Sequence, residues 1–377
     1  MQEASLTEIY RLGNFNDTFA LGHYARVLDA VDRRNGRDVA FKVLRPEHLA
    51  PGAQEPSLEY RAFPNEANLL MRMSGSKHVV RLLDCGYISS PEERPSEGEI
   101  VSYQADILGF IRDSNVMAGR GWRPYLALEL LPRSDNLLYV MKTNLAGARW
   151  RLPTEEGLDL AFQFAAVLKL AHQQRIVYLD HKLEHVYWDG QTLRIIDWNS
   201  SRVVEESTAH TARMFQTDLH HFAVGILYPI FTGLSPQQGA LAPQPAAPNS
   251  INERYAGVTH LDFGMEPTLS RPLQDLLQRG AARAIPSVES FLDELAEVAR
   301  RFGWDFPHRP STDALRQARS QMRAGLKRLR AGQEAILQAR DLFREAAIIE
   351  DINEDTEEEL RRLLTAINDM LAHRVIP

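Results

Sequence analysis

The stretch that most constrains this chain is residues 176–199, which read IVYLDHKLEHVYWDGQTLRIIDWN. The pattern predicts a short strand, a polar turn that carries Asp180 and Lys182, a strand pair around an Asp-Gly turn, and a second polar turn that opens at Asp197. A hairpin of this length returns the chain, so we expect the two polar turns to lie side by side. Two carboxylates and a lysine at one edge suit phosphoryl transfer. One carboxylate holds magnesium, the other orients the hydroxyl nucleophile, and the lysine offsets phosphate charge.

Asp180 and Asp197 are seventeen positions apart, and at this spacing the stretch resembles the protein-kinase superfamily. Asp180 follows Tyr-Leu where that family has His-Arg-Asp, and Lys182 matches the lysine two positions later. His185 falls at the position of a metal-binding asparagine, and Asp197-Trp-Asn at that of Asp-Phe-Gly. The resemblance implies that Asp180 positions the acceptor hydroxyl, that Lys182 stabilises the transferred phosphoryl group, and that Asp197 binds Mg²⁺ with His185 beside it. Imidazole is a poorer magnesium ligand than an amide or carboxylate oxygen. A polar hairpin that carries two aspartates without this function is the alternative.

Residues 19–44 predict strands, with an Asn-Gly hairpin turn before the last of them. Alternation along that strand puts Ala40 and Lys42 on one face. The segment resembles the kinase glycine-rich loop followed by the strand with the ATP-binding lysine. The resemblance implies that Lys42 binds the α- and β-phosphates, and that Gly22, Val27 and Ala40 contact the nucleotide. Only the middle glycine of that loop, Gly22, is retained, and alanines at the flanking positions hinder close approach of the backbone to phosphate. An ordinary edge-strand lysine is the alternative for Lys42.

Residues 58–74 show a helical apolar period and carry two glutamates that matter for Lys42. Glu66 stands where the kinase family has the glutamate of helix C, which pairs with the ATP-binding lysine. The resemblance therefore implies that Glu66 orients Lys42. Glu59 is the competing choice, and a glutamate that is only solvated on the helix surface is the simplest alternative.

Residues 89–122 are rich in proline, glycine and charge, and we interpret them as an insertion between strands. The apolar run 125–131 then predicts a strand that resembles the kinase hinge. By this resemblance, backbone groups of Glu129 and Leu131 bond the edge of an adenine ring. Any buried strand shows the same apolar run, so the pattern alone leaves that interpretation open.

Residues 158–173 and 217–228 predict two helices of a larger, helical part of the chain. The second carries Asp218, which resembles the kinase aspartate that accepts hydrogen bonds from the catalytic-loop backbone. Only twenty-one positions separate Asp197 from Asp218, no Ala-Pro-Glu anchor is present, and Leu179 replaces the arginine that reads a phosphorylated loop. We therefore expect no switching by phosphorylation of an activation loop.

Prolines within residues 307–310 mark a boundary, after which residues 311–377 predict two or three helices. Six basic residues lie within 316–330, and seven acidic residues lie within 350–359. Two solvated helix faces would explain this charge pattern. The alternative is a helical hairpin that forms a homodimer or binds a protein partner or protein substrate.

Composition bounds the class of protein. The 377 residues, 44% of them hydrophobic, can build a sizeable core and more than one domain. A net charge of −7 argues against general nucleic-acid binding. The single cysteine, Cys85, excludes an internal disulfide and fits a reducing compartment. We recognise no signal peptide, and the longest apolar run, 222–234, is too short to span a membrane. We therefore expect a cytoplasmic protein that makes no use of a membrane.

The fold class expected is α+β, in the form of a bilobal protein-kinase-like fold with a small β-rich N-lobe, a large helical C-lobe and a C-terminal helical appendage. The expected boundaries are 1–132 for the N-lobe with its insertion near 89–122, 133–306 for the C-lobe with closing helices at 269–278 and 288–302, and 311–377 for the appendage.

Three functions fit these residues. An ATP- and Mg²⁺-dependent Ser/Thr protein-kinase-like phosphotransferase fits the retained lysines and carboxylates. A pseudokinase that acts as an interaction scaffold fits the lost glycines, the histidine at the asparagine position and the charged C-terminal helices. A small-molecule kinase of the aminoglycoside or choline type fits the Ile-Asp-Trp sequence and the short segment after it. We rank them in this order.

Overall fold

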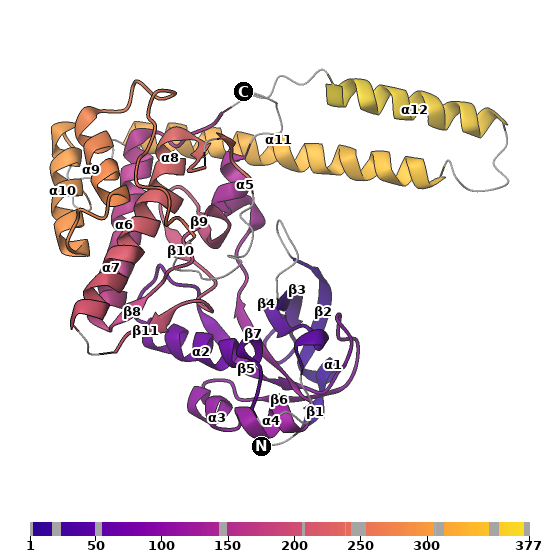
Figure 1. Ribbon diagram of the computed structural model, residues 1–377. Coiled ribbons are helices and arrows are strands. Elements are labelled where there is room, and N and C mark those ends of the chain that lie inside the picture. The colour runs from indigo at the N-terminus through magenta and orange to yellow at the C-terminus, as the bar shows by residue number, and fades with distance from the viewer. Residues whose placement is uncertain are drawn as a thin grey trace. The chain divides into compact units, whose positions relative to one another are not determined.

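A computed structural model describes residues 3–16, 24–49, 55–142, 149–205, 208–237, 239–242, 254–304, 306, 313–346 and 354–372 (Figure 1). The fold is α+β, as the sequence predicts. The chain divides into two compact units, Met1–Pro310 and Ser311–Pro377. Strands and helices of Met1–Pro310 share one large hydrophobic core.

Seven antiparallel strands form a curled sheet, a half-barrel, in the first unit (Figure 1). Their order across the sheet is β1-β6-β5-β7-β4-β3-β2. The strands are β1 (Ala4–Ser5), β2 (Tyr10–Phe15), β3 (Ala25–Asp32), β4 (Arg37–Leu44), β5 (Leu82–Ile88), β6 (Glu99–Ser102) and β7 (Arg123–Glu129). Helix α1 (Leu6–Ile9) joins β1 to β2, and β4 lies between β3 and β7.

Alternation along β4 divides its side chains between two apolar clusters. Val39 and Phe41 are buried in one cluster, which also holds side chains of β2, β3 and β7. Ala40 packs against the other cluster, on the side where Lys42 meets helix α2 (Leu58–Arg72). The expectation that Ala40 and Lys42 share a face is therefore confirmed. The β3–β4 hairpin closes at Gly36, whose φ of +72° costs glycine no strain.

Helix α2 packs against β5 and β7. The Ser57 hydroxyl caps its N-terminus by accepting a hydrogen bond from the Tyr60 N–H at 3.1 Å. Its inward face buries Phe63, Glu66 and Ala67. The helix predicted over residues 58–74 is confirmed, and the structure ends it at Arg72.

The segment 89–122 is part of the sheet and of its cover. Strand β6 lies within it and pairs with β5 and β1, and helices α3 (Ile107–Arg112) and α4 (Ser114–Gly119) pack against α2. The Tyr87 hydroxyl of β5 donates to the Phe110 carbonyl of α3 at 2.6 Å, and the two rings are in contact. The interpretation of this segment as an insertion between strands therefore missed one strand and two short helices.

The rest of the first unit is mainly helical. Its helices are α5 (Leu137–Met141), α6 (Thr154–Gln173), α7 (Thr208–Phe222), the π-helix η4 (Ala223–Leu227), α8 (Tyr228–Thr232), α9 (Arg271–Ala281) and α10 (Val288–Arg301), with short 3₁₀ turns η1 (Pro46–His48), η2 (Arg133–Asp135) and η3 (Leu183–His185). Three strand pairs accompany them, β8 (Ile176–Val177) with β11 (Arg202–Val203), β9 (Val186–Trp188) with β10 (Leu193–Ile195), and β12 (Leu234–Ser235) with β13 (Gly239–Ala240). The helix predicted over 217–228 begins earlier, at Thr208, and the chain continues from α7 into η4 and α8, whose residues are buried.

In the described part of the second unit, helices α11 (Asp313–Ala346) and α12 (Glu354–Ala372) pack against each other. Leu360 and Ile367 of α12 are buried, whereas Met322 and Leu342 of α11 are exposed. No helix in the described part of the chain is both long and apolar enough to span a bilayer.

Candidate functional site

The two polar turns of residues 176–199 meet, as the sequence predicts. Strands β9 and β10 pair so that Val186 faces Ile195, and the Ile196 N–H donates to the His185 carbonyl at 3.0 Å. The residues on either side of this pair are therefore neighbours. Asp180, His185 and Asp197 each offer one possible metal-ligand atom, and these atoms lie within 4.8 Å of one another.

Both turns contain a residue in a backbone conformation that L-amino acids rarely adopt. Leu179 has a φ of 67° and Asp197 a φ of 61°. The Asp218 carboxylate of α7 accepts the N–H of Tyr178 at 3.0 Å and that of Leu179 at 2.7 Å, and His221 Nδ1 lies 2.8 Å from the Leu179 carbonyl. Such strain persists only where the surroundings over-determine it, and it clusters at functional sites. The buried C-terminal part of α7 thus holds the turn that carries Asp180.

Lys42 joins the sheet to both α2 and the second turn. Its Nζ lies 2.7 Å from Glu66 Oε2 and 2.7 Å from Asp197 Oδ1. The other oxygen of Glu66 accepts the N–H of Trp198 at 3.1 Å. Of the two glutamates considered for Lys42, it is Glu66 that forms the ion pair, whereas Glu59 lies in the first turn of α2. A lysine, a glutamate and an aspartate from three distant segments therefore form one buried network.

This network determines the charge of its members. Burial lowers the pKa of the Lys42 ammonium, but the carboxylates of Asp197 and Glu66 outweigh burial and raise that pKa above its usual range. Burial raises the pKa of Glu66 in spite of Lys42. Burial acts on Asp197 in the same direction, but Lys42 and His185 outweigh it and hold the Asp197 pKa well below its usual range. Asp197 is therefore ionised at neutral pH, the state that binds a cation.

Arg254 is a member of the site that sequence reasoning missed. Its Nη2 lies 2.9 Å from Asp180 Oδ1, whereas Lys182 Nζ lies 3.6 Å from Asp180 Oδ2. Both side chains of the Arg254–Asp180 pair are buried, and the contact is an ion pair rather than an aligned hydrogen bond. The neighbouring Tyr255 hydroxyl donates to the His181 carbonyl at 2.7 Å. No local pattern signals Arg254, because only the tertiary fold brings this segment to the turn.

Gly225 of the π-helix permits this close approach. A Cβ at Gly225 would lie 2.4 Å from the His181 carbonyl oxygen and 2.6 Å from the Tyr255 hydroxyl. Any side chain would therefore push the turn of Asp180 away from α7 and η4. π-Helical turns are rare and recur at functional sites.

The expected nucleotide-contacting residues lie along the sheet strands next to Lys42. Val27 faces Lys42 across the β3–β4 pair, and Ala40 faces Leu128 across the β4–β7 pair. The Glu129 N–H donates to the Arg81 carbonyl at 2.9 Å, and Leu131 is half-buried against the main core. Gly22 falls outside the described residues.

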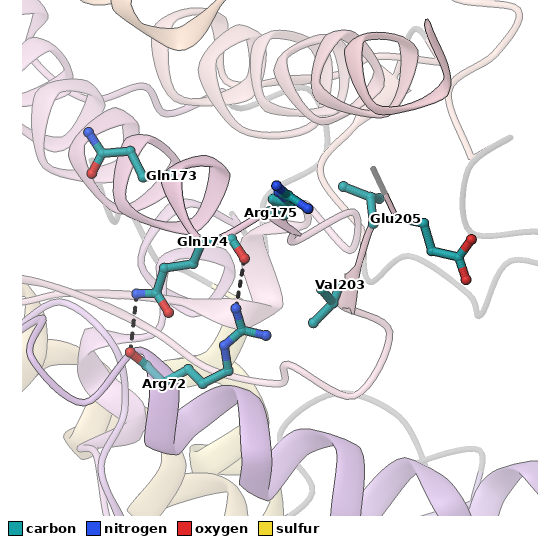
Figure 2. A pocket seen from close by; sticks show the side chains of 7 residues that line it. Arg72, Gln173, Gln174, Arg175, Val203 and Glu205 are labelled. Atoms are coloured by element: carbon teal, nitrogen blue, oxygen red, sulfur yellow. Dashed lines mark hydrogen bonds between the residues drawn. The ribbon is translucent and has the colours of Figure 1, made fainter. Parts of the chain in front are cut away.

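An open pocket of about 670 Å³ lies elsewhere in the first unit and is lined by Arg72, Gln173, Gln174, Arg175, Val203, Val204 and Glu205. None of these residues belongs to the carboxylate–lysine network. Figure 2 shows the reciprocal hydrogen bonds at its edge: the Arg72 guanidinium donates to the Gln174 carbonyl at 2.8 Å, and the Gln174 amide to the Arg72 carbonyl at 3.2 Å. These bonds fasten the end of α2 to the end of α6, so they help to fix the helix that carries Glu66.

The structure thus brings Lys42, Glu66, Asp180, His185 and Asp197 together with Lys182 close by. Comparison with known proteins adds nothing to this geometry, since no protein-family model and no curated protein matches the sequence.

Proposed function

We propose that this chain is an ATP-dependent, protein-kinase-like phosphotransferase that acts on a Ser/Thr hydroxyl of a protein. The observation that carries the proposal is the pairing of Lys42 with both Glu66 and Asp197, the latter 155 positions away. A buried lysine between two carboxylates is costly to desolvate and weak evidence for stability. A binding role for phosphate and metal explains its placement better. The curled sheet with α2 as a small lobe and the helices after α5 as a large lobe is the bilobal arrangement that goes with this proposal.

The donor set fits a divalent cation. Asp197 is ionised, its Oδ1 is held by Lys42 and by the Asn199 amide at 2.5 Å, and its Oδ2 faces His185. Asp180, His185 and Asp197 would hold the ion, which when bound would neutralise charge on the triphosphate of ATP. Lys42, positioned by Glu66, would hold the α- and β-phosphates. The adenine edge would meet the Glu129 carbonyl and the Leu131 amide, because the Glu129 N–H already bonds Arg81.

Asp180 would orient the acceptor hydroxyl. Its Oδ1 faces Arg254, whereas Oδ2 has Lys182 and His185 at 3.6 Å and is the oxygen that a hydroxyl could reach. Lys182, on the same side, would stabilise the transferred phosphoryl group. Cys85 is buried and is a free thiol, which supports a reducing, cytoplasmic location.

A pseudokinase scaffold is the second candidate. The helices of the second unit carry exposed apolar side chains, Met322, Leu342 and Leu363. Basic residues are concentrated in 316–330 and acidic residues in 350–359, so these helices suit a protein partner or a second copy of the chain. In this case the network around Lys42 is structural and the C-terminal helices carry the function. A small-molecule kinase is the third candidate, and the short segment between Asp197 and the start of α7 at Thr208 favours it.

One experiment separates enzyme from scaffold. Wild type, Asp180→Ala and a chain ending at residue 310 are incubated with Mg²⁺ or Mn²⁺ and radiolabelled ATP, and nucleotide binding is followed by thermal shift. The phosphotransferase shows a nucleotide-dependent thermal shift in wild type and in the truncated chain, labels itself or a generic protein substrate in both, and loses labelling in Asp180→Ala. Equal labelling by wild type and Asp180→Ala, or no nucleotide shift in wild type, would contradict the proposal. A chain that labels only free small hydroxyl compounds would indicate the third function.

A further inference from the structure

The imidazole of His185 lies between two oxygen atoms that have no hydrogen to donate. Its Nδ1 is 3.2 Å from the Asp180 carbonyl oxygen, and its Nε2 is 3.1 Å from Asp197 Oδ2. The carbonyl contact requires a proton on Nδ1. With a proton on Nδ1, Nε2 faces Asp197 Oδ2, and a positive charge between these two atoms, either a second ring proton or a bound cation, makes the contact favourable. The site is therefore built around a positive charge at Nε2.

This arrangement is that of a metal-binding histidine. Ligating histidines donate the second ring N–H to a carbonyl or carboxylate, which fixes the tautomer and aims the other nitrogen at the metal. Two ligands about 2.1 Å from one ion and at a right angle are about 3 Å apart, and Nε2 and Asp197 Oδ2 are 3.1 Å apart. Asp180 completes a group of three within 4.8 Å. Oδ1 of Asp197 is already bound by Lys42 and Asn199, which leaves Oδ2 as the ligand oxygen.

The chemical types of the ligand atoms determine which cation the site prefers. Mg²⁺ prefers oxygen ligands and keeps several of its waters, whereas imidazole suits the divalent ions of the first transition series. We propose that Asp180, His185 and Asp197 form a site that prefers a first-row transition-metal divalent cation, with Mn²⁺ as its weakest member, to Mg²⁺. The role of the ion in catalysis rests on the proposed phosphotransferase function. The metal site itself is inferred from the geometry of these three residues.

The charges around the site predict that the ion binds together with an anion. Three carboxylates and three cationic side chains surround the metal site. The carboxylates are Glu66, Asp180 and Asp197, and the cationic side chains are Lys42, Lys182 and Arg254. A divalent ion adds two positive charges that these groups leave uncompensated. A nucleoside triphosphate would supply the missing negative charge, so the ion and the nucleotide should each strengthen the binding of the other.

The test measures bound Mn²⁺ directly, by loss of the free-ion electron paramagnetic resonance signal, in the full chain with and without a non-hydrolysable ATP analogue. We expect Mn²⁺ to remain bound in the presence of about a hundredfold excess of Mg²⁺, since Mg²⁺ cannot replace the nitrogen contact. His185→Asn, which substitutes an amide oxygen, should weaken Mn²⁺ by at least about tenfold, the loss typical even of an outer-shell partner, and leave Mg²⁺ binding in place. His210→Asn, at an exposed position of α7, is the matched control and should bind as wild type does.

Ready displacement of Mn²⁺ by Mg²⁺, equal Mn²⁺ affinity in wild type and His185→Asn, or no Mn²⁺ binding under either condition overturns the site. Urea unfolding of His185→Asn establishes that the variant is folded before its affinity is compared. Failure of the proposed function is seen separately. In that case Mn²⁺ still binds and still depends on His185, but the ATP analogue has no effect on it and no phosphate is transferred.

Discussion

Replacing Lys42 by methionine should destabilise the first unit strongly. The Lys42 side chain is 8% exposed and pairs with Glu66, which is 1% exposed, and with Asp197. Methionine fills the space of the lysine stem but leaves Glu66 as a buried carboxylate without its counter-ion. Removing one partner of a buried ion pair typically costs about 3–5 kcal/mol. We expect a loss of that size in the free energy of unfolding at neutral pH, and with it the loss of ATP-dependent stabilisation.

The loss should depend on pH in a definite direction. Burial raises the pKa of Glu66 even with Lys42 present, and without the ammonium that pKa rises further. A carboxyl group whose pKa is higher in the folded state contributes its stability fully below the unfolded pKa of about 4.3 and loses it as pH rises through the folded pKa. The deficit of Lys42→Met should therefore be largest near pH 8 and shrink towards about pH 5.

A double-mutant cycle isolates this interaction. Wild type, Lys42→Met, Glu66→Gln and the double variant are unfolded in urea at both pH values, with the transition followed by near-UV circular dichroism. Glu66→Gln removes the buried charge at nearly constant volume, so the double variant should be more stable than Lys42→Met, with a coupling energy of about 2–3 kcal/mol. A Lys42→Met loss under about 1 kcal/mol near pH 8, or no rescue by Glu66→Gln, would refute the assignment of Glu66 as a charge held by Lys42.

Three further predictions address the anchoring of the site, its pH limit and the second unit. Asp218→Asn should lower the free energy of unfolding by about 2–4 kcal/mol, since it removes a charge that accepts two backbone N–H groups, and should abolish phosphate transfer; a loss below about 0.5 kcal/mol in urea unfolding would show that the turn is held by other contacts. Burial lowers the pKa of His181 to about 4, so the neutral ring contributes stability above its unfolded pKa of about 6.5 that is lost as pH falls towards the folded value. His181→Leu should make the stability less steep in that window by up to about 1.4 kcal/mol per pH unit, and identical slopes would rule this out. Removal of Ser311–Pro377 should leave the first unit folded with a melting temperature close to that of the full chain, because it is compact by itself, and should remove any self-association in sedimentation experiments; a truncated chain that does not fold, or that associates as before, would contradict this.

Much of the site could be predicted from local sequence because its residues lie on regular elements. Alternation in β4 puts Ala40 and Lys42 on one face, and the β9–β10 hairpin returns Asp197 to His185. Each of these placements follows from a period of two residues or from a hairpin of fixed length. The α+β class followed from the same patterns.

Other features could not be predicted because they depend on contacts between distant segments. The strand β6 hidden in residues 89–122 is four residues long, and its partners β1 and β5 lie on either side of it in the sheet but not in the sequence. A short, polar-flanked strand has little periodicity of its own, so pairing rather than propensity decides that it forms.

The arrangement of the site likewise depends partly on local sequence and partly on tertiary contacts. The hairpin by itself brought Asp180 and His185 close to Asp197, whereas the pairing of Glu66 with Lys42 was expected only from the resemblance to protein kinases. Only the tertiary structure decided how they meet: Arg254 reaches Asp180, and the His185 ring spans the Asp180 carbonyl and the Asp197 carboxylate. The physical reason is that a backbone period specifies the face on which a side chain lies, whereas its orientation, charge state and partners depend on groups that other parts of the chain bring within a few ångströms.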